Sequence, residues 1–258
     1  MLDQVVVIGY GTQKKADLTG SVAVVDMEKA RKMPATDIAS MLQGQVGGVS
    51  VGTSSQPGAM AAIRVRGVGS FSNVGPLYVI DGMIVNDANN LNPHEIENMQ
   101  VLKDASAAAI YGARGANGVI LITTKKGKAG KPTLDVTANV SIAQMPKTIK
   151  MMGARDFMYY NEQAYLNANA AWPAASIEPG TVLADTDWQK AVYQNGITQD
   201  YNLVYTQGTE NIHNSLSAGY MDQTGVVKGP KYQRFTVRFN NDATYKALTV
   251  GENFTYQH

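Results

Sequence analysis

VLKDASAAAIYGARGANGVILITTKK, residues 101–126, is the stretch that decides the fold. An apolar strand candidate opens it, and Asp104 then provides an N-cap for a short helix rich in alanine. Gly112 supplies the left-handed residue that ends such a helix, and Gly118 contributes to a tight reversal. The run VILITT at 119–124 is typical of a buried strand. A strand, a slender helix, a glycine loop and a second strand form a compact unit, so we expect other elements to cover both of its sides.

The composition argues against several classes of protein. The 258 residues are 44% hydrophobic, which permits a sizeable core in one large or two medium domains. Lysine and arginine total 22 against 21 acidic residues, so there is no basic footprint for nucleic acid. The sequence has no cysteine for disulfides or for a zinc site. No apolar run approaches the roughly 18 residues of a membrane-spanning helix. Residues 1–3 are not a secretory signal, so we expect any export signal to have been removed or left out.

Residues 20–127 indicate a small α+β domain of short strands and short helices. Asp81-Gly82 lies between two apolar runs and predicts a two-residue hairpin turn. The stretch Asn92-Pro93-His94-Glu95 has the N-cap, the proline and the glutamate that begin a helix with a capping box. We expect that helix to continue through Ile96 and Met99 and to deliver the chain to residue 101.

Nothing in this half of the chain supports catalysis. His94 is its one histidine and lies in the first turn of the predicted helix, where a structural role is the better interpretation. Asp81, Asp87 and Asp104 are turn or cap residues. A nucleophile with its base, a cluster of metal ligands and a complete phosphate loop are all missing from the sequence pattern. We therefore expect a protein that is not an enzyme, with no catalytic residues, no metal site and no cofactor.

The amino-terminal run QVVVIGYG, residues 4–11, allows three interpretations. A dinucleotide-binding turn would need a third glycine at Lys14 and an amphipathic helix after it, and neither is present. An ordinary edge strand is the second interpretation. The third is an extended, uncommitted segment that adds as a strand to the sheet of another protein. The terminal position and the β-branched content favour this third interpretation.

After Pro132 the pattern changes to a period of two. Apolar and aromatic side chains alternate with polar ones in five segments of about ten residues, which fits strands of a transmembrane β-barrel. The predicted strands are 134–142, 199–207, 212–221, 232–241 and 247–256. Short connections at 208–211 and 242–246 alternate with long ones at 143–198 and 222–231, as periplasmic turns alternate with external loops. We expect helices near 155–167 and 187–194 within the first long loop.

A soluble β-sandwich is the alternative, because alternation alone does not distinguish lipid from a protein core. The strongly polar opposite face and the open edges of a five-stranded sheet argue against it. We expect an incomplete barrel with about 17 further strands, because plugged transporters have roughly 22. The stretch KKGKAGKP at 125–132 is the best domain boundary. The predicted parts are therefore 1–19, 20–127 and 128–258.

Several segments, in their joint order, resemble SusC/RagA-type TonB-dependent outer-membrane receptors over nearly the whole chain. Residues 2–15 resemble the TonB box of that family and the residues after it. The segments that resemble its plug domain are 42–49, 63–67, 78–82 and 101–124. The segments that resemble its first barrel strands and loops are 187–189 and 219–229.

The resemblance implies an α+β plug domain followed by antiparallel transmembrane β-barrel strands. It also implies energy-coupled import of large nutrients, either glycan or peptide oligomers, across the outer membrane. The expected partners are TonB in the periplasm and a SusD-like lipoprotein at the cell surface, with the plug and the amino terminus on the periplasmic side. The residues expected to contact TonB are Asp3, Gln4, Val5, Val6, Val7 and Ile8.

Two further sets of site residues are predicted. Arg64 and Arg66 leave the face that Ile63 and Val65 bury, so they either lie on a solvated face or pair with carboxylates of an enclosing wall. Under the second interpretation, Arg114 joins them in holding the plug. Loops on the external side of the plug are expected to face the ligand. These ligand-facing residues are Ser70, Phe71, Ser72, Asn73, Asn89 and Asn90. A soluble adhesion or binding protein and a nucleotide-binding enzyme are the alternative functions.

Overall fold

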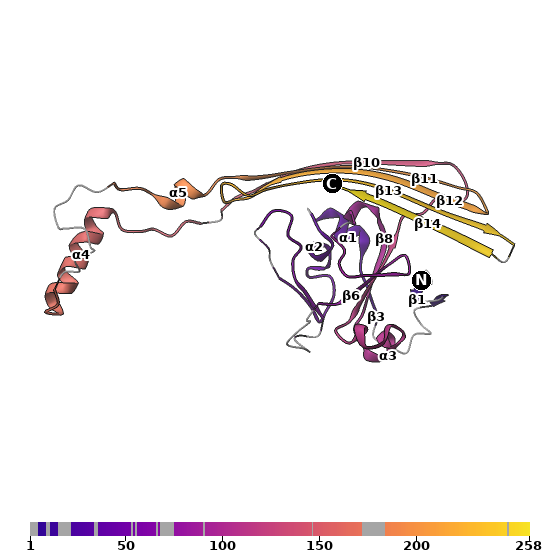
Figure 1. Cartoon of the computed structure of the whole chain (residues 1–258), viewed down its shortest axis with the longest axis horizontal. Helices are drawn as coiled ribbons and strands as arrows, with labels where there is room; N and C mark the ends of the chain where they lie inside the picture. The colour runs from indigo at the N-terminus through magenta and orange to yellow at the C-terminus, as the bar shows by residue number, and fades with distance from the viewer. Residues whose placement is uncertain are drawn as a thin grey trace.

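The computed structural model has two main parts (Figure 1). A mixed α/β unit, residues 22–124, is called the plug below, and a five-stranded antiparallel sheet within 133–257 is called the wall. The wall arches over one side of the plug. The structure describes residues 5–8, 11–14, 22–33, 36–52, 54, 56–65, 67, 75–89, 91–145, 147–171, 184–246 and 248–258.

The plug is built on a five-stranded sheet with the order β3-β8-β9-β6-β7. Its strands are β3 (Val22–Val24), β6 (Leu77–Ile80), β7 (Met83–Val85), β8 (Ile96–Leu102) and β9 (Val119–Thr124). β6 and β9 run parallel, and the other neighbours run antiparallel. The two strands of the opening stretch, β8 and β9, therefore occupy the centre of the sheet.

Short helices and a second small sheet cover this central sheet. The helical segments are α1 (Met27–Lys32), α2 (Ile38–Leu42), the 3-10 turn η2 (Pro93–Glu95), α3 (Ala105–Ala108) and the 3-10 segment η3 (Ala109–Gly115). The small sheet pairs β4 (Val49–Val51) with β5 (Ile63–Val65). Asp26 and Asp37 cap α1 and α2 by accepting hydrogen bonds from the amides of Lys29 and Ser40.

The main core of the plug lies between the helices and one face of the central sheet. Its fully buried large side chains include Ile38, Met41, Leu42, Ile96 and Ile120. A smaller core on the opposite face holds the alanine helix α3 against β8, β9 and β6. The small alanine side chains allow α3 to approach the sheet closely, so both faces of the opening stretch are covered as expected.

The structure corrects one prediction in the plug. The helix predicted to continue from residues 92–95 through Ile96 and Met99 is wrong, because only residues 93–95 form a 3-10 turn and β8 begins at Ile96. Apolar residues at 96, 99 and 102 fit one face of a helix and equally fit a strand buried on both faces. Pairing with β3 and β9 selects the strand. The Asp81-Gly82 turn is confirmed, with φ of 49° and 86° and Ile80 paired to Met83.

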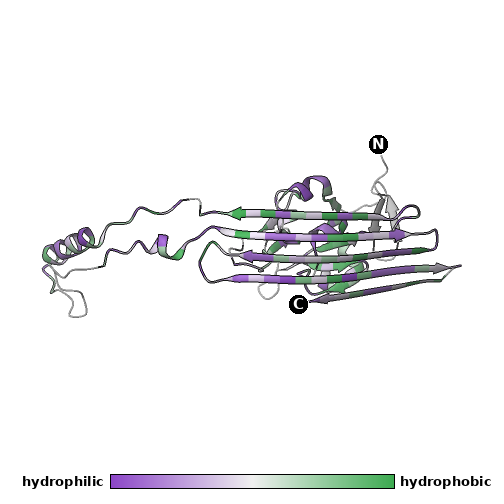
Figure 2. Ribbon diagram, turned by 90° about the horizontal axis from the view of Figure 1, so that it is seen from above, coloured by the Kyte–Doolittle hydropathy of each residue, from purple (hydrophilic) through white to green (hydrophobic). Residues whose placement is uncertain are grey.

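The wall consists of five strands that follow one another in space as they do in sequence. They are β10 (Thr133–Ala143), β11 (Gly196–Gly208), β12 (Ile212–Thr224), β13 (Lys231–Tyr245) and β14 (Leu248–Gln257). The sheet is open, with β10 and β14 at its edges, and Figure 2 shows hydrophilic and hydrophobic residues alternating along its strands. The fold prediction of an α+β plug followed by antiparallel strands of an incomplete barrel is confirmed.

The wall buries its polar face and exposes its apolar face, which is the opposite of a sheet in a soluble protein. Side chains that face the plug are buried and mostly polar, such as Asn202 and Thr236. Side chains on the outer face are apolar and exposed, such as Leu203 at 39% and Phe235 at 44%. A soluble sandwich buries its apolar face, so this arrangement disfavours that alternative.

The connection between β10 and β11 extends away from the rest of the molecule (Figure 1). It contains α4 (Ala154–Asn167) and α5 (Trp188–Val192), near the two predicted helices, and neither has a buried residue. None of the helices in the described part of the chain has the length and hydrophobicity needed to span a membrane.

Candidate functional site

The interface between plug and wall buries a row of polar side chains. Strict alternation in β11, β12 and β13 directs one side chain in two toward the plug. The polar wall residues buried in this way are Thr198, Asp200, Asn202, Ser215, Ser217, Arg234, Thr236, Arg238 and Asn240. A polar interface can open without exposing much apolar surface to water.

Glu95 lies at the centre of this interface. Its side chain is 6% exposed, and its Oε2 lies 3.1 Å from Nε of Arg238, which is 7% exposed. The N–H of Arg238 Nε does not point at this oxygen closely enough for a hydrogen bond, so the two side chains form an ion pair without one. The hydroxyl of Ser217 donates to Oε1 of Glu95 at 2.8 Å. Burial raises the pKa of Glu95, and Arg238 and the Ser217 hydrogen bond offset part of that rise.

Further polar contacts flank this pair on both sides. The side-chain amide of Asn92 donates to the side-chain oxygen of Asn202. Nε2 of His94 lies 3.4 Å from a carboxylate oxygen of Asp200. These contacts extend the 92–95 segment of the plug across β11, so one short turn carries much of the docking.

The end of β9 forms a second docking point. Asn240 donates from its side-chain amide to the hydroxyl of Thr124 at 3.3 Å. Thr124 is in turn held by Asp81, whose carboxylate accepts from the Thr124 amide at 2.9 Å and from its hydroxyl at 2.7 Å. The hairpin turn of the plug therefore fixes the residue that meets β13.

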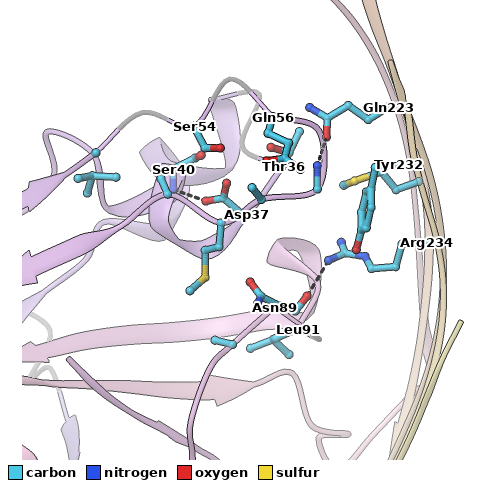
Figure 3. Close-up of a pocket in the computed structure, with 18 of the residues that line it drawn as sticks. Thr36, Asp37, Ser40, Ser54, Gln56, Asn89, Leu91, Gln223, Tyr232 and Arg234 are labelled. Atoms are coloured by element: carbon cyan, nitrogen blue, oxygen red, sulfur yellow. Dashed lines mark hydrogen bonds between the residues drawn. The ribbon is translucent and has the colours of Figure 1, made fainter. Parts of the chain in front are cut away.

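A cavity of about 160 Å³ lies between plug and wall near the turn from β12 to β13 (Figure 3). Tyr232 and Arg234 project from β13 toward the plug, and Arg234 donates to the backbone oxygen of Asn89 at 2.7 Å. Asp37 lines the cavity from the plug side. The cavity thus has an acidic side chain on the plug and a basic one on the wall.

A glycine loop of the plug closes one side of this cavity. The amide of Gly58 donates to Oε1 of Gln223 at 3.1 Å. Gly58 has φ of 73°, and a Cβ atom on it would collide with the ring of Tyr232. Pro57 packs against Gly225, where an added Cβ would lie 3.2 Å from its Cγ. Residues 57–58 are therefore docked on the β12–β13 end of the wall.

The chain passes from plug to wall through a tightly packed lysine- and glycine-rich segment. Lys126 pairs with Asp242 at 2.5 Å, and Lys128 pairs with Glu97 at 2.7 Å. A Cβ atom on Gly127 would collide with the backbone carbonyl of Gln207. Only glycine fits at this position, because a backbone neighbour cannot rotate away.

The amino-terminal segment forms a separate two-stranded sheet. β1 (Val5–Ile8) pairs antiparallel with β2 (Gly11–Lys14), with Ile8 opposite Gly11. The prediction of an extended segment is confirmed for residues 5–8, whereas the prediction that it is uncommitted is wrong, because β2 already pairs with it. Asp3 and Gln4 lie outside the described residues.

Comparisons with known proteins agree with this architecture. Residues 14–119 match the TonB-dependent Receptor Plug Domain. TonB-dependent receptor P39 of Formosa agariphila is 38% identical over 98% of this chain, and TonB-dependent receptor SusC of Bacteroides thetaiotaomicron is 40% identical over 93%. The RagAB peptide importer in its open-open state superposes with a TM-score of 0.83 at 33% identity, over 98% of this chain and 32% of that one. This chain belongs with the SusC/RagA-type TonB-dependent receptors.

The similarity covers only part of those proteins. The chain spans 25% of the length of receptor P39 and 24% of that of SusC. The siderophore receptor PirA of Acinetobacter baumannii, at 17% identity and a TM-score of 0.56, shares the fold alone. The names of these relatives describe receptors and importers.

The predicted plug arginines of this SusC/RagA-type receptor do not meet the described wall. Arg64 is exposed on β5, and Arg114 is exposed in η3. α3, which precedes η3, lies on the side of the plug away from the wall in Figure 1. Neither arginine forms a hydrogen bond or ion pair with another described residue, and Arg66 lies outside them. A role for all three in holding the plug stays a prediction.

The acidic and basic partners lie on the opposite sides of the interface from those predicted. The carboxylate, Glu95, belongs to the plug, and the guanidinium, Arg238, belongs to the wall. The sequence predicts a capping-box role for Glu95, whereas in the structure its carboxylate meets Ser217 and Arg238 of the wall. Arg234 and Arg238 lie four residues apart on the polar face of β13, opposite Phe235, Val237 and Phe239, and this spacing is the sequence signal for them.

The predicted ligand-facing residues are mostly untested by the structure. Ser70, Phe71, Ser72, Asn73 and Asn90 lie outside the described residues. Asn89 is exposed and lines the cavity beside Arg234. In the described part of the chain, no group of three or more histidine, aspartate or glutamate side chains is arranged to hold a metal ion.

Proposed function

We propose that this protein imports large nutrients, glycan or peptide oligomers, across the outer membrane, with the plug gating the lumen enclosed by the wall. The apolar outer face of the wall faces lipid, and its polar inner face holds the plug. The plug and the amino terminus lie on the periplasmic side, and TonB supplies energy through residues 3–8. A SusD-like lipoprotein covers the opposite side and receives the nutrient.

The observation that carries the proposal is the buried polar interface around Glu95 and Arg238. A permanent core would be stabilised better by apolar packing, since burying an ion pair costs desolvation energy that its attraction barely offsets. A polar interface costs less to separate in a hydrated lumen, because each group can exchange its partner for water. This arrangement suits a plug that is retained at rest and displaced during import.

The peptide or glycan class of the nutrient rests on the relatives alone. One similar structure is described as a peptide importer, and another relative is the receptor SusC. Growth of a host strain that expresses this receptor as its sole importer, on maltodextrin oligomers or on oligopeptides, distinguishes the two classes.

The test of energy coupling removes residues 5–8 from the receptor carrying this sequence. Calorimetric titration with the periplasmic domain of TonB should detect binding to the parent receptor and none to the deletion variant. Unchanged binding after deletion would show that TonB contacts another segment. A parent receptor recovered in the soluble fraction without detergent would contradict the outer-membrane location.

A further inference from the structure

Arg234 of the wall is a buried cation without an acidic partner among the described residues. It is 7% exposed, and its guanidinium donates to the backbone oxygen of Asn89 at 2.7 Å. The buried carboxylate of the interface, Glu95, forms its ion pair with Arg238 instead. A guanidinium has five donors and always carries its charge, and a buried charge is stabilised by an opposite charge close to it. Arg234 therefore has both donors and charge available for an anionic ligand.

The cavity beside Arg234 has room for one ligand group. Its volume of about 160 Å³ is close to the roughly 150 Å³ of an engineered cavity that binds benzene in another protein. Figure 3 shows Arg234 reaching toward this space from β13, next to Tyr232. Gln56 and Asn89 line the cavity and are exposed, so it is open to solvent. A group of the size of one amino-acid residue can therefore enter it.

Asp37, on the plug side of the cavity, restricts the charge of such a ligand. Its carboxylate accepts from the amide of Ser40 and caps α2. Like charges repel at short range, so a dianion such as phosphate is disfavoured in this space. A carboxylate carries a single negative charge, and its two oxygens match the fork of a guanidinium in a bidentate pair. The charges around the cavity therefore favour a carboxylate.

The rest of the lining favours the end of a peptide over an acidic sugar. The apolar residues of the lining are Val51, Met60, Leu91 and Met221. The side chain of a carboxyl-terminal residue can cover these apolar groups, whereas the hydroxyls of a uronic acid ring would lose water against them. On this basis, which rests on the proposed function, we propose that the cavity binds the carboxyl-terminal residue of an imported peptide, with Arg234 pairing with its carboxylate.

Calorimetric titration of the purified receptor that carries this sequence tests the site without any substitution. The probes are N-acetylated penta-alanine with a free carboxyl terminus and the same peptide with a carboxamide terminus. We expect the free acid to bind at least about tenfold more tightly, because the carboxamide lacks the charge that pairs with Arg234. Equal binding of the two peptides, or no binding of the acid, would overturn the proposal. Tighter binding of trigalacturonate than of the acid would also overturn it, because the site would then be one for an acidic glycan.

A matched pair of arginine variants tests whether Arg234 holds the carboxylate. Arg234→Gln should reduce the preference for the free acid to within about threefold. Arg31 is the control, because its guanidinium also donates to a backbone oxygen, that of Ile96, at 2.7 Å but does not line this cavity. Arg31→Gln should therefore keep the full preference. A preference that survives Arg234→Gln would overturn the assignment.

Two further measurements separate this site from folding and from import. Arg234→Lys keeps the buried charge but lacks the fork of a guanidinium, so its preference for the acid should be intermediate, and an unchanged preference would overturn the assignment. Failure of the proposed function gives a different result. The parent receptor would then bind the acid with the expected preference, while a host strain with this receptor as its sole importer would take up neither peptide.

Discussion

Replacement of Gly58 by alanine should undock the loop at residues 57–58 from the wall. Gly58 has φ of 73°, and its added Cβ would collide with the ring of Tyr232. Gly44 provides a matched control, because its φ of 71° is nearly the same and no atom lies within 4 Å of its added Cβ. The two substitutions share the backbone cost and differ in the collision.

The expected losses of stability follow from the backbone cost and from the collision with Tyr232. A left-handed conformation costs an L-residue about 1–2 kcal/mol, which is the whole expected effect of Gly44→Ala. Overpacking against the Tyr232 ring adds about 1–3 kcal/mol to Gly58→Ala. In a Tyr232→Ala background the collision is absent, so Gly58→Ala should there cost about 1–2 kcal/mol, as Gly44→Ala does.

Hydrogen exchange measures the undocking directly. The Gly58 amide donates to Gln223, and the amide of Ala59 donates to the carbonyl of Gln56, so both report the loop. Against the Gly44→Ala control, the amide of Ala59 should exchange about tenfold faster or more in Gly58→Ala, since 1.4 kcal/mol corresponds to about tenfold. Equal rates in the two variants, or no recovery with Tyr232→Ala, would refute docking through this contact.

Three further changes test other parts of the interface. Burial raises the pKa of Glu95, so its contribution to stability is complete below the unfolded-state pKa and is lost as pH rises through the folded-state pKa. Urea unfolding of the plug should therefore show a free energy that falls over this pH window, and Glu95→Gln should remove that slope; an unchanged slope assigns it to another group. Gly127→Ala should lower the stability of the folded receptor by about 3 kcal/mol or more, because its Cβ would collide with the carbonyl of Gln207. The yield of folded receptor in the outer membrane measures this loss, and a normal yield would argue against tight packing at Gly127. Asp81→Asn should lower the free energy of plug unfolding by about 1 kcal/mol, because one of two hydrogen bonds to Thr124 is lost, and a change below a few tenths would exclude this role.

Local patterns predicted the elements whose signals lie within a few residues. The Asp81-Gly82 turn follows from the conformational tolerance of these two residues, and both have positive φ as expected. The wall strands follow from alternation over ten or more residues, a length at which a period of two is unambiguous.

Local sequence patterns predicted only part of the candidate site. Polar positions of the wall were predicted from alternation, but their partners were not. Glu95 meets Ser217, 122 residues further along the chain, through a register that three strand pairings determine together. A single sequence carries no local signal for such a contact, and the pattern of the plug strand around Arg64 therefore predicts a basic partner on the plug, whereas the observed one, Arg238, lies on the wall.

Sequence alone determined the two building principles of this protein: short elements with glycine turns before residue 125, and alternating strands after residue 132. Both depend on side-chain size and periodicity, which neighbouring residues express. Tertiary structure decided that residues 96–102 form a strand, that the carboxylate lies on the plug and the guanidinium on the wall, and that β1 has a partner. Each of these outcomes depends on which surface another segment presents, and only the assembled fold supplies that surface.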